Sequence, residues 1–456
     1  MIALGITAVI SCAGVLTARF LERRYIHVLA PIPFPHKDEG IALQKLAFNQ
    51  PDLLPIYGSS ELVKPSGKKP TDFFRDYPTG FSVFPVGRAG ATSLVILQKL
   101  AAVGSDLHGK KLAILLSPSW FFHPNVRISY YSGNFSLLQA GELIYSGQLS
   151  FSLKCDVARQ MLQYPATLEK STLLAFSLKQ IAANSPVSRA LYYLTVPLGR
   201  MANGILRVED YLETLFFVVK EWGALQVGVR RSSSAVDWDD LIAQAASQTR
   251  EQNDTDQKPN GVENGSTAFI TAERIGHEWT DFELLLRGLN ELGARPLLLS
   301  IPMNGRYCDR FGVDRKSRDL YYKRISALAR NYDIPLIDFE EHDEDEDFLV
   351  DHHDHLSDKG WLYFDKALDD FFHDRLASSD SVEWRETPIS ASVKGPASES
   401  ARENEETKAD AMKGHDDRCK APIQASSPKL PLLVPAREQI IERKQTGVIH
   451  SVNNVM

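Results

Sequence analysis

The chain has 456 residues, of which 43% are hydrophobic and 24% are charged, a composition typical of a globular protein with one large domain or two ordinary ones. Its formal net charge of -7 gives no broad basic field, which argues against a nucleic-acid partner. The cysteines lie far apart and argue against a disulfide-stabilised scaffold and a structural zinc site; they are Cys12, Cys155, Cys308 and Cys419.

The N-terminal segment from Ile2 to Ala18 contains no charged residue. Closely spaced charged residues follow it, namely Arg19, Glu22, Arg23 and Arg24. Because roughly 17–25 apolar residues span a bilayer, we predict a single membrane-anchoring helix within 1–24. A cleaved signal peptide, or lipoprotein processing at Cys12, is the alternative. The positive-inside tendency of the arginines favours a cytoplasmic location for the rest of the chain, which conflicts with the extracytoplasmic location that the chemistry below favours.

After a proline-rich link, apolar strand-like segments alternate with helical ones. We predict strands at 52–57, 81–86, 111–116, 295–301 and 334–339. We predict helices at 90–103, 135–222 (several segments), 239–249, 287–293, 315–331 and 359–373. Because parallel strands need crossover connections, this alternation predicts an α/β fold. Its parallel sheet is covered by helices on both faces and binds ligands at the carboxyl ends of the strands.

This organisation predicts one α/β domain at 34–376. The helical stretch at about 135–222 forms an insertion in it, and the polar segment at about 231–266 forms a mobile loop around a short helix. From 377 to 456 the chain is charged, contains serine and proline, and has weak periodicity. We therefore predict a disordered tail without catalytic residues.

The first segment with unusual chemistry is Gly58-Ser59-Ser60, at the end of the first predicted strand. A strand that stops at a glycine and turns sharply exposes the next small polar side chain at the edge of the sheet. A nucleophilic serine needs this arrangement, with a fixed hydroxyl and nearby backbone amides that receive an oxyanion. The alternative is an ordinary strand-to-helix turn in which Ser59 or Ser60 caps the helix.

The second such segment runs from Asp351 to His355 and contains three histidines and two aspartates. Histidine takes and returns a proton near neutral pH, and a neighbouring carboxylate fixes its tautomer and orientation. A zinc or iron site is an alternative, because His and Asp are also metal ligands. The acidic run at 340–347 can attract cations, but such a run is more often a solvated loop. Together with Ser60, the cluster predicts a catalytic triad, which a fold can assemble from distant residues.

Several short segments resemble the DltD family of D-alanyl-lipoteichoic acid biosynthesis proteins. They occur in the order of that family and cover about 34–372; they are 58–62 (GSSEL), 87–94 (GRAGATSL), 109–111 (GKK), 117–121 (SPSWF), 302–305 (PMNG) with Gly312, and 355–357 (HLS) with 359–361 (KGW). The resemblance implies an N-terminal membrane helix and an SGNH-hydrolase-like domain with a flavodoxin-like sheet.

Carried over position by position, the resemblance implies that Ser60 is the nucleophile and His355 its general base. It places Gly90 near the second SGNH block, where a backbone amide meets the oxyanion together with the amide of Ser60. It also implies that Ser117 and Trp120 line the site at the end of the third strand.

The chain departs from the family at the third member of the triad. The family usually has an aspartate three residues before the histidine, where this chain has His352. The nearest aspartates are Asp351 and Asp354. We favour Asp351, because a short loop can absorb one residue, whereas Asp354 adjoins His355. The usual asparagine of the third SGNH block is not recognisable.

The resemblance implies acyl transfer through a serine ester, with D-alanine as the acyl group and a cell-envelope glycopolymer or lipid as the acceptor. It implies a membrane-bound O-acyltransferase and an acyl-carrier protein as partners, and a catalytic domain on the extracytoplasmic side of the cytoplasmic membrane. No cofactor is predicted, since no phosphate-binding loop or nucleotide fingerprint is visible, and no residue is assigned to a metal. The alternatives are an envelope esterase or thioesterase, a non-catalytic scaffold for a membrane O-acyltransferase, and a metal-binding envelope protein.

Overall fold

The computed structural model describes residues 2–123, 128–221, 235–248, 265–351 and 354–376. The chain divides into two units, Met1–Glu386 and Thr387–Met456, and all of the described residues belong to the first. The predicted tail at 377–456 and most of the predicted loop at 231–266 therefore lie outside the described residues.

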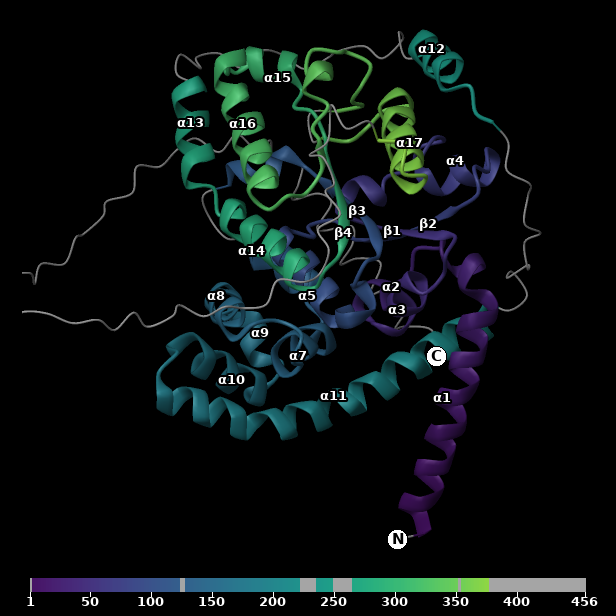
Figure 1. Cartoon of the computed structure of the whole chain (residues 1–456), viewed down its shortest axis with the longest axis vertical. Coiled ribbons are helices and arrows are strands. Elements are labelled where there is room, and N and C mark those ends of the chain that lie inside the picture. The colour runs from purple at the N-terminus through teal and green to yellow at the C-terminus, as the bar shows by residue number, and fades with distance from the viewer. Residues whose placement is uncertain (1, 124–127, 222–234, 249–264, 352–353, 377–456) are drawn as a thin grey trace, which may run out of the picture. The chain divides into compact units, whose positions relative to one another are not determined.

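Five parallel strands form one sheet in the order β2-β1-β3-β4-β5 (Figure 1). They are β1 (Leu53–Gly58), β2 (Ser82–Gly87), β3 (Lys111–Leu116), β4 (Arg295–Ser300) and β5 (Leu336–Ile337). The prediction of an α/β fold with a parallel sheet is confirmed. This strand order is that of flavodoxin-like folds, in which ligands bind at the switch point between β1 and β3.

The last strand is shorter than the predicted 334–339. Its residues Leu336 and Ile337 pair with β4, and the strand then ends. Asp333 and Phe339 have left-handed backbone conformations, with φ of 56° and 49°, which interrupt the extended chain on both sides. The chain therefore leaves the sheet early and enters the long loop that carries His355.

Side chains along the strands alternate between two buried clusters, one on each face of the sheet. Tyr57, Ile114 and Leu298 belong to the first cluster. The helices that complete it include α3 (Ala42–Phe48), α5 (Ser93–Val103), α14 (Glu278–Glu291) and α16 (Arg315–Asn331). The second cluster contains neighbouring strand residues such as Ile56 and Ala113, and its helices are α4 (Pro70–Asp76), α12 (Trp238–Gln248) and α17 (Asp358–Phe372). Burial on both faces explains why the strands are continuous apolar runs.

The helical stretch predicted at 135–222 corresponds to a layer of helices that lies between β3 and β4 in the sequence. Its helices are α6 (Ile128–Asn134), α7 (Leu137–Tyr145), α8 (Phe151–Met161), α9 (Pro165–Glu169), α10 (Thr172–Ala183) and α11 (Pro186–Lys220). Ser136, Ser150 and Ser171 cap three of them by accepting a hydrogen bond from an amide three residues on. The 35-residue α11 packs against α7 and α10 (Figure 1).

The N-terminal helix α1 (Ile2–Leu29) is longer than the predicted segment and packs on α11 and α3. Among the helices that the structure describes, none is both long enough and apolar enough to cross a bilayer, so the predicted transmembrane anchor is not supported. The helix mixes small and polar residues, such as Gly5, Thr7 and Ser11, with its apolar ones, and it continues without a break into the charged residues at 19–24.

Short helical turns follow the carboxyl ends of three strands. η1 (Ser60–Leu62) follows β1, η3 (Pro118–Phe122) follows β3, and α15 (Gly305–Arg310) follows β4. The other short elements include α2 (Pro35–Glu39), η2 (Gly104–Leu107), α13 (Gly265–Ile275) and η5 (Glu340–His342). The predicted site residues after β1 and β3 therefore lie at one edge of the sheet.

Candidate active site

Ser60 begins the turn η1 directly after β1, and it is half-buried. A Cβ at Gly58 would lie 2.4 Å from Glu61 Oε1, so a side chain there would displace the Glu61 carboxylate. Ser59 is only 3% exposed, and its hydroxyl accepts a hydrogen bond from the Gly90 amide at 3.0 Å. The turn thus uses Ser59 for structure and leaves the Ser60 hydroxyl at the edge of the sheet.

His355 lies in a hairpin-like loop that precedes α17. The Val350 amide donates to the His355 carbonyl at 2.9 Å, the Ser357 amide donates to the Phe348 carbonyl at 3.0 Å, and Leu349 forms an antiparallel bridge with Leu356. This pairing holds positions 351 and 355 on neighbouring arms of the loop. His352 and His353 lie outside the described residues.

The fold brings Ser60, His355 and Asp351 into one hydrogen-bonded chain. His355 Nε2 lies 3.0 Å from Ser60 Oγ, although the two residues are 295 positions apart. His355 Nδ1 lies 2.9 Å from each carboxylate oxygen of Asp351. This is the geometry of a nucleophile, a general base and a carboxylate that orients the base.

Lys64 also reaches this chain, and the sequence did not reveal it. Its Nζ lies 2.5 Å from Asp351 Oδ2 and 2.7 Å from His355 Nδ1. Burial raises the pKa of Asp351, but hydrogen bonds from His355 and Lys64 outweigh burial and hold that pKa below its usual range. In the sequence, the signal for Lys64 is its position four residues after Ser60, about one helical turn. In the structure, the Lys64 amide donates to the Ser60 carbonyl at 3.0 Å.

Lys64 and Asp351 compete for the same ring nitrogen. If Nδ1 carries the proton, it donates to Asp351, and Nε2 is free to accept the Ser60 proton. If Lys64 donates to Nδ1 instead, Nε2 carries the proton and cannot act as a base. Asp351 can accept hydrogen bonds from Lys64 Nζ and from a protonated His355 Nδ1 at once. It therefore favours the tautomer with the proton on Nδ1.

Glu61 is buried beneath the nucleophile turn, with only 2% of its surface exposed. Its carboxylate accepts a hydrogen bond from the Ser59 amide at 2.5 Å. Burial raises the pKa of Glu61 to about 7, although the Ser59 amide, its own amide and His355 act in the opposite direction. A titratable group therefore lies under the turn that fixes Ser60.

Asp354, the other candidate for the triad, points away from His355. Its Oδ2 accepts hydrogen bonds from Ser117 Oγ and from the Ser119 amide, each at 2.8 Å. Its backbone has a left-handed φ of 61°, which turns the side chain toward the end of β3. Burial raises the pKa of Asp354 despite these bonds. Asp354 thus ties the histidine loop to β3.

Of the residues expected to bind the oxyanion or line the site, Gly90 and Ser117 already form other hydrogen bonds. Gly90 follows β2, but its amide is bonded to Ser59 Oγ, so it can meet an oxyanion only after the Ser59 hydroxyl turns away. Ser117 is buried and bonded to Asp354. Trp120 is half-buried in η3, with its ring edge-on to Tyr130 at 5.4 Å. Ser117 is therefore a support of the histidine loop.

The acidic run after β5 is held by basic partners, and the expectation of a solvated loop is wrong for its centre. Asp343 is buried against Arg318, with Oδ1 3.0 Å from Nε. Lys359 lies 3.2 Å from Asp345 and 2.9 Å from Asp347. Within the described part of the chain, no three or more His, Cys, Asp or Glu residues are grouped to hold a metal ion.

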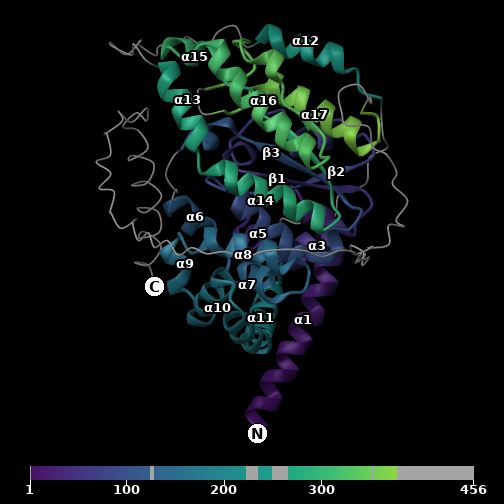
Figure 2. The same ribbon diagram turned by 60° about the vertical axis from the view of Figure 1, so that its left-hand side comes forward.

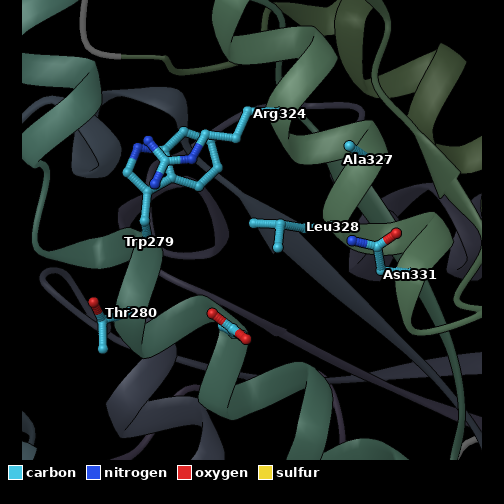
Figure 3. Close-up of a pocket in the computed structure, with 7 residues that line it drawn as sticks. Trp279, Thr280, Arg324, Ala327, Leu328 and Asn331 are labelled. Atoms are coloured by element: carbon cyan, nitrogen blue, oxygen red, sulfur yellow. The ribbon is translucent and has the colours of Figure 1, made fainter.

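A cavity of about 230 Å³ lies elsewhere, between α14 and α16 (Figure 3). Its lining comprises Trp279, Thr280, Glu283, Arg324, Ala327, Leu328 and Asn331. The guanidinium of Arg324 lies 4.2 Å from the centre of the Trp279 ring and narrows one end. The lining includes none of the residues around Ser60, so this cavity contributes nothing to the candidate active site.

Comparison with known proteins gives one consistent result. A family model described as "DltD protein" matches residues 35–373, a range that contains Ser60, Asp351 and His355. "Protein DltD" of Bacillus subtilis is 27% identical over 349 residues, which cover 74% of this chain and 87% of that protein. "Protein DltD" of Staphylococcus aureus is 25% identical over 341 residues (72% and 83%), and that of Lacticaseibacillus rhamnosus is 23% identical over 354 residues (74% and 80%).

Proposed function

The chain belongs to the DltD family, and from this premise we propose that it is an SGNH-type serine acyl-enzyme that takes part in the D-alanylation of a cell-envelope polymer or lipid. One observation supports the enzymatic part above all others. Ser60 Oγ, the His355 imidazole and the Asp351 carboxylate form a continuous relay at the carboxyl edge of the sheet.

The relay supports a two-step acyl transfer. His355 Nε2 takes the Ser60 proton as Ser60 Oγ attacks the carbonyl carbon of an activated D-alanyl ester or thioester. The leaving group departs with that proton and leaves a D-alanyl ester on Ser60. His355 then takes the proton of an acceptor hydroxyl, whose oxygen attacks the ester, and returns the proton to Ser60.

Backbone amides stabilise the oxyanion in both steps of this proposal. The Ser60 amide is one donor, and the Gly90 amide becomes the second when the Ser59 hydroxyl rotates away from it. Asp351 keeps the His355 proton on Nδ1 and stabilises the imidazolium that forms. These assignments give Ser60, Gly90, His355 and Asp351 distinct tasks.

The proposed setting is the extracytoplasmic side of the cytoplasmic membrane. A membrane-bound O-acyltransferase and an acyl-carrier protein are the proposed partners, as the family resemblance implies. The acceptor is an envelope glycopolymer or lipid that offers a hydroxyl group.

Labelling with a serine-directed fluorophosphonate tests the proposal. We expect the label on Ser60 alone, and we expect Ser60→Ala to abolish both labelling and envelope D-alanylation. Ser66→Ala is the matched control, because Ser66 is half-buried in the same part of the chain and its hydroxyl bonds Asp358 and the Lys68 amide instead of the relay. A label on another serine, or normal D-alanylation with Ser60→Ala, refutes the proposal.

A hydrolase is the second candidate, favoured by the partial exposure of the site. Ser60 is half-buried, and 24% of the Asp351 side chain is exposed, so water has access to the ester. An esterase or thioesterase turns over soluble model esters without an acceptor. A transferase releases the acyl group quickly only after an acceptor alcohol is added.

A further inference from the structure

The long helix α11 is polar on the side that faces the protein and apolar on the side that faces outward. Its buried residues are Tyr192, Thr195, Gly199, Asn203, Asp210, Thr214 and Val218. Its exposed apolar residues include Val187, Leu191, Leu194, Leu198, Met201 and Ile205, which we call the α11 stripe. A surface helix of a water-soluble protein has the opposite arrangement.

Specific contacts fix this orientation. Asn203 donates to the Glu142 carboxylate at 3.2 Å, and the Tyr192 hydroxyl donates to the Ile144 carbonyl at 2.6 Å. Asp210 accepts from the amides of Ile41 and Ala42, each at 2.9 Å. A rotation of α11 that buried its stripe would break these buried hydrogen bonds, so the stripe faces outward.

The spacing of the α11 stripe makes it one continuous face. Its residues recur every three or four positions from Val187 to Ile205, and Leu198 is 53% and Leu194 72% exposed. At a rise of about 1.5 Å per residue, the stripe is about 27 Å long. It is one helix wide, which is the shape of a helix that lies in the plane of a membrane surface.

The N-terminal helix exposes further apolar residues near the C-terminal part of α11. Helix α1 crosses α11 where Gly14 meets the side chain of Leu212, which lies two turns beyond Ile205 on the line of the stripe. Beyond this crossing α1 exposes Ile6, Val9 and Ile10, and near it Leu16 and Phe20. Figures 1 and 2 both show α11 along the outer side of α7 and α10, with α1 crossing it.

The charges on α11 favour lipid over a protein partner. From position 186 to 208 the helix contains Arg189, Arg200 and Arg207 and no acidic residue. At about 100° per residue, the three arginines lie on one flank of the helix, between the stripe and the protein body. Arg207 donates to the Glu142 carboxylate through two nitrogens, and half of its side chain remains exposed. Arginines in this position lie at the level of the phosphate groups when the stripe enters the acyl layer.

We propose that α11 lies in the surface of an anionic phospholipid bilayer, with the α11 stripe among the acyl chains and its arginines among the phosphates. The inference is independent of the acyl group that Ser60 carries. It assigns the helical layer a task that the sequence did not indicate. The layer holds the catalytic domain on the membrane in a fixed orientation.

Nitroxide scanning of the full chain tests the proposal. Single cysteines replace Leu194, Leu198 and Ile205 on the stripe, in a background where the four native cysteines are replaced. Gly204→Cys is the matched control, because Gly204 adjoins Ile205, lies on the flank and has open space around it. The labelled proteins are reconstituted in vesicles of phosphatidylcholine and phosphatidylglycerol, and circular dichroism verifies the helix content.

We expect the stripe nitroxides to be relaxed by oxygen and protected from a water-soluble nickel complex, and Gly204→Cys, on the flank that carries the arginines, to respond more to nickel and less to oxygen than the stripe positions do. Vesicles without phosphatidylglycerol should reduce the contrast, because the arginines then lack anionic partners. The proposal is overturned if the stripe positions respond to nickel as Gly204→Cys does. It is also overturned if they are protected from both reagents, because that result places a protein surface, from a partner, a second copy or the tail of this chain, on the stripe.

Discussion

Asp351 and Asp354 both lie within four residues of His355, but their surroundings predict different effects of substitution, one on reactivity and one on stability. In the proposed triad Asp351 orients the ring, so Asp351→Asn should slow labelling of Ser60 by roughly a thousandfold or more, with little loss of stability. Asp354→Ala should instead lower the free energy of unfolding by on the order of 3 kcal/mol, because Ser117 and Ser119 lose a buried acceptor. Labelling kinetics and denaturant titration measure the two effects, and an exchange of the two phenotypes contradicts the assignment.

Lys64 offers a second test at the level of one residue. In the wild type Lys64 and Asp351 both reach His355 Nδ1, so two ring tautomers compete. Lys64→Met should leave only the tautomer with the proton on Nδ1, whereas Lys64→Arg retains the competition. Nitrogen NMR of a histidine-labelled protein distinguishes the tautomers. An unchanged spectrum in Lys64→Met shows that Lys64 does not influence the ring.

The sequence predicted the residues around Ser60 only where their chemistry is distinctive. Ser60 and His355 were predicted because each follows a predicted strand, and Asp351 was preferred because a short loop can absorb one residue. The structure places all three together. Lys64 and Glu61 were not predicted, because a lysine and a glutamate in a turn are usually solvated. Their approach to the relay depends on how η1 faces the histidine loop, which no local pattern encodes.

At the level of secondary structure, the turn after β2 provides a stability test. Gly90 has a φ of 85°, and a side chain there would overlap the Tyr130 ring. Gly90→Ala should therefore destabilise the protein by on the order of 2 kcal/mol or more. Gly204→Ala is the matched control, since nothing contacts that position and alanine favours a helix. Equal stability of the two variants in thermal unfolding contradicts the argument.

The elements themselves were predictable to different degrees. β3 and α16 have the predicted bounds, because a doubly buried strand is a plain apolar run and an amphipathic helix has a clear period. β5 was predicted too long, because the left-handed residues Asp333 and Phe339 leave no apolar signal. The outward face of α11 was unpredictable, since the partners of its polar face lie in α7 and before α3.

The molecule as a whole should lose stability as the pH rises from about 4.5 to 7. The pKa of Glu61 is raised to about 7, mainly by burial. The pKa of Glu278 is raised to about 8 by burial and by the negative charge of Asp281. Unfolded carboxyls release their protons near 4.5, so in this interval the folded state binds more protons and deprotonation favours unfolding. The contribution of Glu61 is on the order of 3 kcal/mol.

Above pH 7 a buried lysine acts in the opposite direction. Burial lowers the pKa of Lys37 to about 7, so the unfolded chain holds a proton that the folded chain has released, and a rising pH favours folding. Unfolding midpoints should therefore fall between pH 5 and 7 and level off above it. Glu61→Gln should flatten the first part of the curve, and a wild-type midpoint that rises steadily from pH 5 to 7 contradicts the prediction.

The parallel sheet has a consequence for biosynthesis, because its first strand supplies the hydroxyl and the loop after its last strand supplies the imidazole. A ribosome that has reached the end of α16 has already released Ser60, but the group that activates it has not yet been made. Under the proposed mechanism, Ser60 of the nascent chain is therefore unreactive until nearly the whole domain has emerged. Its proposed reactivity toward acyl donors would begin only when folding is almost complete.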